Sequence, residues 1–87
     1  MKILNKIVQM VVWFDENGIP TPVRFRFKNK DESFTIIKIN DILIRDKEHL
    51  AGNPMLVYRC KSYINGIEKL YEIKYEINSC KWILWKI

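Results

Sequence analysis

Histidine, cysteine and glycine are scarce in this chain of 87 residues, which has one histidine, two cysteines and three glycines. The single His49 and the unpaired Cys60 and Cys80 cannot supply the four ligands of a standard zinc site. A small secreted scaffold held by disulfides would carry more cysteine. The stretch 50–54 holds one glycine, Gly52, and so lacks the several exposed backbone amides of a phosphate-binding loop.

Residues that could carry out catalysis are also few. His49 has Asp46 and Glu48 near it in the sequence, but a general-base pair depends on a geometry that this spacing does not define. We expect His49 to be a surface residue, Cys60 to be a small buried hydrophobe, and Cys80 to lie at an exposed turn without a neighbouring base. The sequence therefore predicts no catalytic residue, no metal ligand and no cofactor, and we do not expect an enzyme.

Long hydrophobic runs are absent as well. The longest run in the opening segment, at residues 10–14, is far shorter than the roughly 20 residues that span a bilayer. The polar residues Asn5, Lys6 and Gln9 interrupt this segment, and no small-residue cleavage site follows it, so it does not have the pattern of a signal peptide. We therefore expect a cytoplasmic protein that does not interact with a membrane.

The chain is rich in apolar residues, which make up 48% of it. Aromatic and β-branched side chains are abundant, which excludes a disordered composition, and the length predicts one small β domain over residues 1–87.

The formal net charge of +5 is unevenly spread. Residues 21–40 hold five cations against two acids, namely Arg24, Arg26, Lys28, Lys30 and Lys38 against Asp31 and Glu32. This surplus is smaller than the basic stripe of a dedicated DNA-binding protein.

Apolar residues recur with a period nearer two than 3.6, which predicts strands. Pro20 and Pro22 indicate a sheet edge or a connection before the second strand. Residues 46–51 are expected to form one helical turn that Gly52 ends. The expected fold class is all-β, a meander of about six short antiparallel strands curled into a small barrel or a strongly bent sheet. Its first strands are expected at 7–14, 23–28 and 34–39, the last of these continuing past a bend to 42–45.

Two turn signals define the last third of the chain. Asn65-Gly66 predicts a two-residue hairpin turn, and a second turn is expected at Asn78-Ser79. Counting outward from the first turn pairs Cys60 with Tyr71, Tyr58 with Ile73, Leu56 with Tyr75 and Arg59 with Glu72. Counting from the second pairs Tyr75 with Trp82, Ile73 with Leu84 and Glu76 with Lys81. Both registers bury the same face of the shared strand, which is why we expect both hairpins to form.

The hexapeptide VRFRFK alternates without exception. Phe25 and Phe27 point one way, and the cations Arg24, Arg26 and Lys28 point the other. The preferred interpretation of the cations is a solvated strand face that discourages edge pairing, and the alternative is contact with nucleic-acid phosphates. Base stacking would favour the alternative if aromatic rings lay beside the cations, but the two phenylalanines lie on the opposite face.

The C-terminal segment carries a second apolar stripe. Trp82 and Leu84 belong to the expected core face, so Ile83, Trp85 and Ile87 lie on the other face. The preferred interpretation is that the N-terminal segment, which is apolar on both faces, buries this stripe. Otherwise the stripe is a surface for a partner, in which tryptophan is a frequent anchor.

Several landmarks follow one another in a characteristic order along nearly the whole chain. They are Asp15-Glu16-Asn17-Gly18, Pro22 before VRFRF, Thr35-Ile36-Ile37-Lys38-Ile39, Asp41-Ile42-Leu43, Gly52 before Tyr58-Arg59-Cys60, Leu70-Tyr71-Glu72, and Trp82 in the last strand. This order resembles a family of small, uncharacterised β-rich bacterial proteins of the Firmicutes type. The resemblance implies a small cytoplasmic β domain and brings no assigned activity.

These features favour a non-enzymatic interaction module that binds a protein partner, or a second copy of itself, through Ile83, Trp85 and Ile87. The alternative hypothesis is a small β-barrel that binds nucleic acid weakly through the basic strand 23–28. A third hypothesis, a small-molecule binder at the barrel mouth, has no residue to support it.

Overall fold

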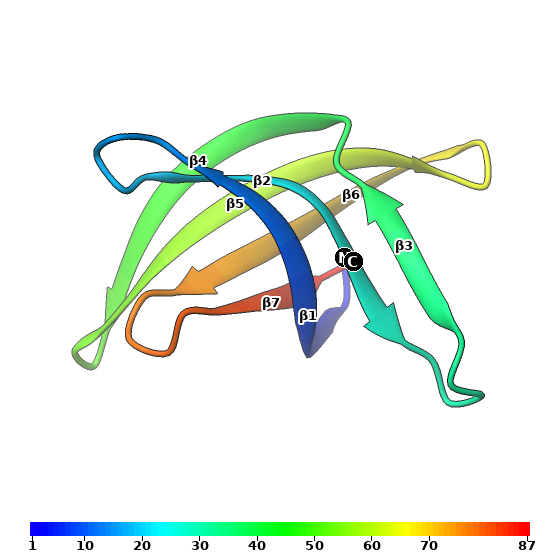
Figure 1. Cartoon of the computed structure of the whole chain (residues 1–87), viewed down its shortest axis with the longest axis horizontal. Coiled ribbons are helices and arrows are strands. Elements are labelled where there is room, and N and C mark those ends of the chain that lie inside the picture. Colours follow the sequence, from blue (N-terminus) through cyan, green and yellow to red (C-terminus); the bar gives the residue numbers. More distant parts are fainter.

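The computed structural model describes all 87 residues, which form one curled sheet of seven antiparallel strands without any helix (Figure 1). The strands are β1 (Ile3–Phe14), β2 (Pro20–Lys28), β3 (Phe34–Lys38), β4 (Asp41–Leu50), β5 (Asn53–Ile64), β6 (Ile67–Glu76) and β7 (Lys81–Lys86). The all-β meander expected from the sequence is confirmed, with seven strands instead of about six. No segment forms a helix that could cross a membrane.

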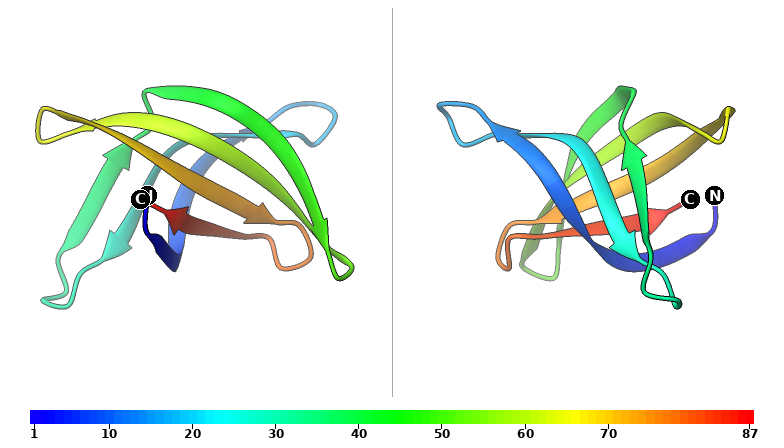
Figure 2. Two further views of the ribbon diagram at one scale, coloured as in Figure 1. Left: turned by 180° about the vertical axis from the view of Figure 1, so that it is seen from behind. Right: turned by 45° about the vertical axis from the view of Figure 1, so that its right-hand side comes forward.

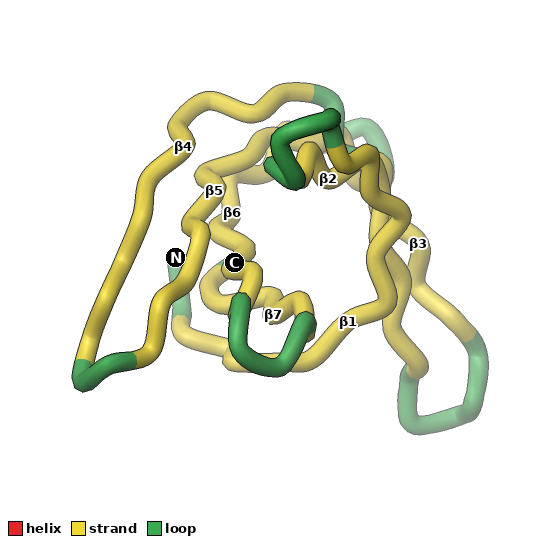
Figure 3. The backbone as a smooth tube through the Cα atoms, turned by 60° about the vertical axis from the view of Figure 1, so that its left-hand side comes forward, coloured by secondary structure: helices red, strands yellow, loops and turns green.

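The order of strands across the sheet is β3-β2-β1-β7-β6-β5-β4, so β3 and β4 are its two edges although they are neighbours in the chain. The sheet curls until these edges approach each other, and its backbone traces a partly open ring (Figures 2 and 3). At one end of the sheet, the link between β3 and β4 packs against β5. There the Asn40 amide donates to the Lys61 carbonyl (3.0 Å), and the Asn40 side-chain oxygen accepts from the Tyr63 amide (3.1 Å).

The ladder between β1 and β7 joins the two ends of the chain. Ile3 lies opposite Lys86 and Val8 opposite Trp82. Beyond the ladder, the backbone amides of Lys2 and Ile87 donate to each other's carbonyls at 2.8 and 3.0 Å, and the two termini lie together in Figure 1. All the remaining ladders of the sheet join strands that are consecutive in the chain. A few contacts also bring β3 near β5.

Both hairpin registers expected in the last third of the chain are confirmed. Cys60 lies opposite Tyr71, Tyr58 opposite Ile73 and Arg59 opposite Glu72. In the next ladder, Tyr75 lies opposite Trp82, Ile73 opposite Leu84 and Glu76 opposite Lys81. Asn65 and Gly66 both have positive φ angles, of 53° and 77°, which is the geometry that a type I′ turn requires.

The expectation of a helical turn at residues 46–51 is wrong, because β4 continues as a strand to Leu50. Ala51 and Gly52, with φ angles of 52° and 77°, form a second hairpin turn of the same kind as Asn65-Gly66. Alanine is an unusual residue at that position, since the left-handed conformation costs a residue with a Cβ atom roughly 1–2 kcal/mol. The long β4–β5 ladder, which runs from Asp41–Lys61 to Leu50–Asn53, overrides this local preference.

The second strand begins at Pro20 and not at residue 23 as expected, so both prolines lie within β2, in the part of this strand that is unpaired on one side. Pro20 and Pro22 pair with β1 on one side, and β3 begins to pair with β2 only at Arg24. Their missing amides therefore cost no hydrogen bond in the sheet. The register between β1 and β2 shifts at Val11 and Val12, opposite this proline segment.

The core fills the concave side of the sheet, and its buried residues come from every strand except β4, from which the partly buried Ile42 packs against it. It includes a buried polar contact, in which the Ser62 hydroxyl donates to the Lys38 carbonyl (2.6 Å) and shares a hydrogen bond with the Tyr71 hydroxyl (2.5 Å). Because Ser62 lies on β5 and Lys38 on β3, this contact helps to close the ring. The buried apolar residues are Val8, Phe25, Ile37, Ile39, Tyr58, Cys60, Tyr71, Ile73, Trp82 and Leu84.

Candidate functional site

The cations of the basic strand lie on the convex, outer side of the sheet. Arg24, Arg26 and Lys28 are exposed, whereas Phe25 between them is 1% exposed and belongs to the core. The alternation expected for VRFRFK is therefore present. Phe27 is half-buried and packs against the core from the same inner face.

Neighbouring strands add further residues to the same outer face. On β3, Lys38 lies opposite Arg24, Ile36 opposite Arg26 and Phe34 opposite Lys28. On β1, Val11 lies opposite Arg24, and Trp13 lies opposite Thr21, the second pair beyond the register shift. Trp13 alternates with Val12, which packs against the core, so Trp13 points outward. We call the outer surface of β1, β2 and β3 the cationic face. Its exposed apolar residues are Ile7, Val11, Trp13, Phe34 and Ile36, and its cations are Arg24, Arg26, Lys28 and Lys38.

Contacts within the cationic face orient its side chains. The Arg26 Nε donates to the Gln9 side-chain oxygen at 2.7 Å, and the Arg26 guanidinium carbon lies 4.2 Å from the centre of the Phe34 ring. The Lys28 Nζ lies 5.9 Å from the same ring. Beside Arg26, a shallow open hollow of about 400 Å³ runs between Val11, Arg24 and Ile36. The face thus presents one oriented cation, Arg26, next to ring surfaces and to three further exposed cations.

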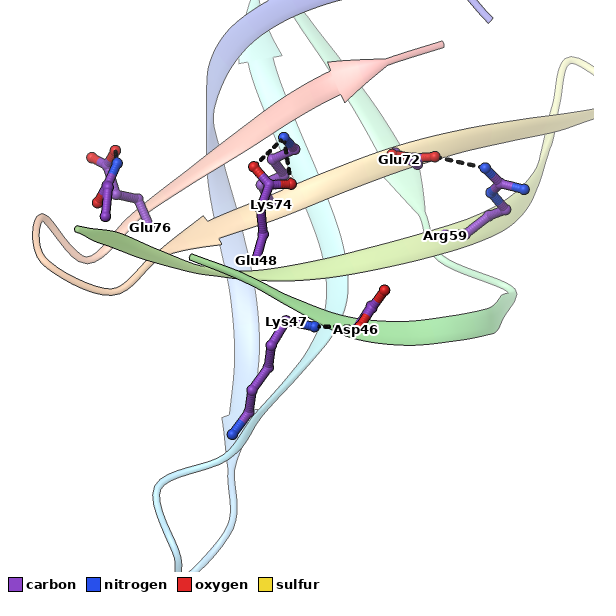
Figure 4. A network of polar contacts seen from close by, with 8 residues as sticks. Asp46, Lys47, Glu48, Arg59, Glu72, Lys74 and Glu76 are labelled. Atoms are coloured by element: carbon purple, nitrogen blue, oxygen red, sulfur yellow. Dashed lines mark hydrogen bonds and ion pairs between the residues drawn. The ribbon is translucent and has the colours of Figure 1, made fainter. Parts of the chain in front are cut away.

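None of the four cations on this face takes part in an ion pair. All four ion pairs of the protein lie between β4, β5 and β6, and they include Arg59–Glu72 at 2.8 Å and Lys74–Glu48 at 3.1 Å (Figure 4). Arg24 even lies directly opposite another cation, Lys38. Like charges that face each other across strands are destabilising, so the fold gains nothing from this arrangement.

The stripe expected at Ile83, Trp85 and Ile87 is not continuous. Ile83 and Trp85 are half-buried on the outer face, whereas Ile87 packs against the core. The reason is a shift of register between β6 and β7, where Lys86 rather than Trp85 lies opposite Glu72. That irregularity turns the end of the chain inward. The expectation that all three side chains share one face is therefore wrong.

The N-terminal segment does not cover this stripe as we expected. It pairs beside β7 within the same sheet, with Ile7 opposite Ile83. The Trp85 ring is instead covered by Lys74, whose Nζ lies 4.1 Å from the ring centre. The same Nζ bonds both carboxylate oxygens of Glu48 at 3.1 Å. Trp85 is thus part of a packed cluster and offers only a partial surface to a partner.

The remaining reactive side chains do not come together. Cys60 is buried, and burial raises the pKa of its thiol to about 12, which keeps it in the unreactive thiol form. Cys80 is exposed at the end of the β6–β7 turn, and His49 is exposed on β4. No three histidine, cysteine, aspartate or glutamate side chains are grouped so that they could hold a metal ion.

Sequence reasoning missed Trp13, Phe34 and Lys38 as neighbours of the basic strand. The strict alternation of residues 34–38 was a usable signal, because it places Phe34, Ile36 and Lys38 on one face. What the sequence left open was the register across the turn at 29–33, which determines that this face is the one that carries Arg24 and Arg26.

Comparisons with protein-family models, with curated proteins and with solved structures found no match to this chain.

Proposed function

We propose that this protein binds nucleic acid, with the cationic face as its contact surface for the phosphate backbone. The observation that carries the proposal is the set of four cations, Arg24, Arg26, Lys28 and Lys38, that lie on one acid-free sheet face without an ion pair. Phosphates that approach this face would be neutralised by the cations and would release their counterions, which favours binding.

The arrangement of Arg24 opposite Lys38 supports this proposal in particular. The four ion pairs of the protein lie between β4, β5 and β6, whereas Arg24 and Lys38 face each other between β2 and β3 without a carboxylate partner. An anion bound between them would convert the mutual repulsion into two attractions. The exposed rings of Trp13 and Phe34 beside these cations remove the objection that aromatic side chains lie only on the core face.

A second copy of the chain fits the cationic face less well. A symmetric dimer brings the same patch of both subunits together, so the cations Arg24, Arg26 and Lys38 of one copy would lie against the cations of the other. The surface around Trp85 is also less suitable for a protein partner, since Lys74 covers the ring and Ile87 points to the core. These contacts leave nucleic acid as the occupant that matches the exposed charge.

Fluorescence anisotropy of a labelled oligonucleotide of about 15 residues, titrated with the full chain, tests the proposal. We expect log K to fall linearly with log salt between about 50 and 200 mM, with a slope of about −0.7 for each phosphate contacted on a single strand. Four contacts give a slope of about −2.8, and the double variant Arg24→Ala, Arg26→Ala should reduce it to about −1.4.

The matched control is Lys69→Ala, Lys81→Ala, which removes the same number of charges from exposed positions on β6 and β7 outside any ion pair. It should leave the slope close to that of the parent chain. Poly-L-glutamate serves as a competitor without phosphate or bases. If poly-L-glutamate competes as well as the oligonucleotide at equal charge, or if both double variants lose affinity equally, the assignment to nucleic acid is overturned.

A further inference from the structure

We infer that the nucleic acid is single-stranded, and that its unpaired bases stack on Trp13 and on the pair formed by Phe34 and the Arg26 guanidinium, on the two sides of β2. This inference rests on the proposed function, because it takes the phosphate contacts of β2 as given. It adds whether the nucleic acid is single-stranded or double-stranded, which electrostatics alone does not define.

Trp13 is the side chain that points most clearly to stacking. It is 73% exposed, the highest value among the large apolar residues. The other two tryptophans have partners, because Trp82 packs against Tyr58 and Tyr75 in the core and Trp85 lies under Lys74. Trp13 alone has neither an aromatic neighbour nor a cation over its ring. A fully available indole next to a cationic strand is the typical platform for a base.

Phe34 lies on the opposite flank of β2 and is 41% exposed. Arg26 stacks over its ring at 4.2 Å, and Gln9 holds the same guanidinium through its Nε at 2.7 Å. A fixed, planar guanidinium is itself a stacking surface for a base. The pair of Phe34 and Arg26 therefore offers a second platform, two strands away from Trp13 in the order β3-β2-β1.

A duplex cannot use these platforms. Its bases are stacked on one another and paired, and they present only their edges in the grooves. Ring faces that protrude from a convex sheet can reach a base only where the base is unpaired and free to turn outward. A single strand that crosses β1, β2 and β3 satisfies the rings and the cations together, whereas a duplex would leave Trp13 in water.

The inference is tested by comparing a single strand with the duplex of the same sequence at about 50 mM salt. We expect the single strand to bind at least tenfold more tightly. Trp13→Ala should weaken single-strand binding about tenfold, in the range found for loss of one base stack, and should leave duplex binding unchanged. Trp13→Phe keeps a ring and should restore most of the loss. Tyr63→Ala, which removes an exposed ring beside Lys61 on β5, is the matched control and should have no effect.

Intrinsic fluorescence gives an independent readout. Quenching by an unlabelled single strand should be present in the parent chain and in Trp85→Phe, and absent in Trp13→Phe. Circular dichroism of each variant establishes that it is folded, which the high exposure of Trp13 leads us to expect.

The outcomes separate this inference from the proposed function. Equal binding of single strand and duplex, with no effect of Trp13→Ala but a clear effect of Arg24→Ala, Arg26→Ala, overturns the single-strand inference alone. Absence of binding to either nucleic acid at about 50 mM salt overturns both.

Discussion

The outer surface of the sheet has two halves that differ in whether their cations form ion pairs. On β4, β5 and β6, cations and carboxylates alternate and form four ion pairs, two of which appear in Figure 4. On β1, β2 and β3, four cations stand without a carboxylate partner, and Arg24 faces Lys38. The first half neutralises three of its cations, Arg59, Lys61 and Lys74, within the fold. The second half neutralises none of its cations, which is what we expect of a surface whose partner ions come from another molecule.

The two halves also differ in what their cations do for stability. Lys74 is 8% exposed, holds Glu48 and covers Trp85, so it belongs to the structure of its half. Arg24 is exposed and is bonded to no other side chain. Truncating a cation should therefore destabilise the protein in the first half and leave its stability nearly unchanged in the second, and this difference can be measured without any ligand.

The largest effect is expected for Lys74→Ala. It removes the partner of Glu48, whose side chain is 27% exposed, and leaves that carboxylate partly buried and unpaired. We expect the free energy of unfolding in urea to fall by about 2 kcal/mol, less than the 3–5 kcal/mol found when a fully buried pair is broken. Arg24→Ala is the matched truncation and should change stability by less than about 0.5 kcal/mol. Equal losses in the two variants would refute the contrast between the halves.

An intermediate effect is expected from Glu76, at the end of β6. Its carboxylate accepts hydrogen bonds from the Ser79 hydroxyl and from the Asn53 amide (2.9 Å), which lower its pKa below the ordinary value of 4.5. Since the pKa is lower in the folded protein, the stabilisation is present above that ordinary value and is lost as the pH falls through the folded value. Glu76→Gln should therefore destabilise the protein at neutral pH, and the difference should shrink in acid.

Urea unfolding at a series of pH values measures this difference. Glu16→Gln, an exposed acid in the β1–β2 turn, serves as the control and should behave like the parent chain at every pH. A constant difference between Glu76→Gln and the parent across the acid range would contradict the role assigned to the carboxylate. The pKa itself can be followed by nuclear magnetic resonance titration of the Glu76 side chain.

The smallest effect on stability is expected for Arg24→Glu. This change replaces the like-charge pair with Lys38 by an ion pair across the strands, which should raise the free energy of unfolding by about 0.3 kcal/mol. The same variant should bind an oligonucleotide far more weakly than the parent. Arg24→Gln removes the repulsion without adding an attraction and should fall between the two. A clear loss of stability in Arg24→Glu would show that the fold needs this cation.

The parts of the fold that the sequence predicted are those controlled by short-range turn chemistry. Asn65-Gly66 requires only local backbone geometry, and counting from it yields the β5–β6 pairs down to Arg59–Glu72. Ala51-Gly52 makes the same turn, but alanine carries no signal for a left-handed conformation, so residues 46–51 were assigned to a helical turn. What decides there is the pairing of β4 with β5, which no local pattern reveals.

The candidate site was predictable only in part for the same reason. Alternation alone places Arg24 and Arg26 on the wet face of a strand. Their neighbours depend on the register of β1 and β3 against β2, which includes a shift at Val11 and Val12. The irregularity near Trp85, which sends Ile87 to the core, is likewise a long-range result of how β7 fits between β6 and β1.

The ladder between β1 and β7 has a consequence for how the chain reaches this structure. The strands β1 to β3 and the strands β4 to β7 can each form from their own hairpins, with little loss of chain entropy. Joining the two groups requires contact between residues near opposite ends of the chain, such as Ile3 and Lys86, and such loop closure is the step that slows β-rich domains. We therefore expect the group β1 to β3 and the group β4 to β7 to be the units of folding. The ladder between β1 and β7 should be the last to form and the first to open.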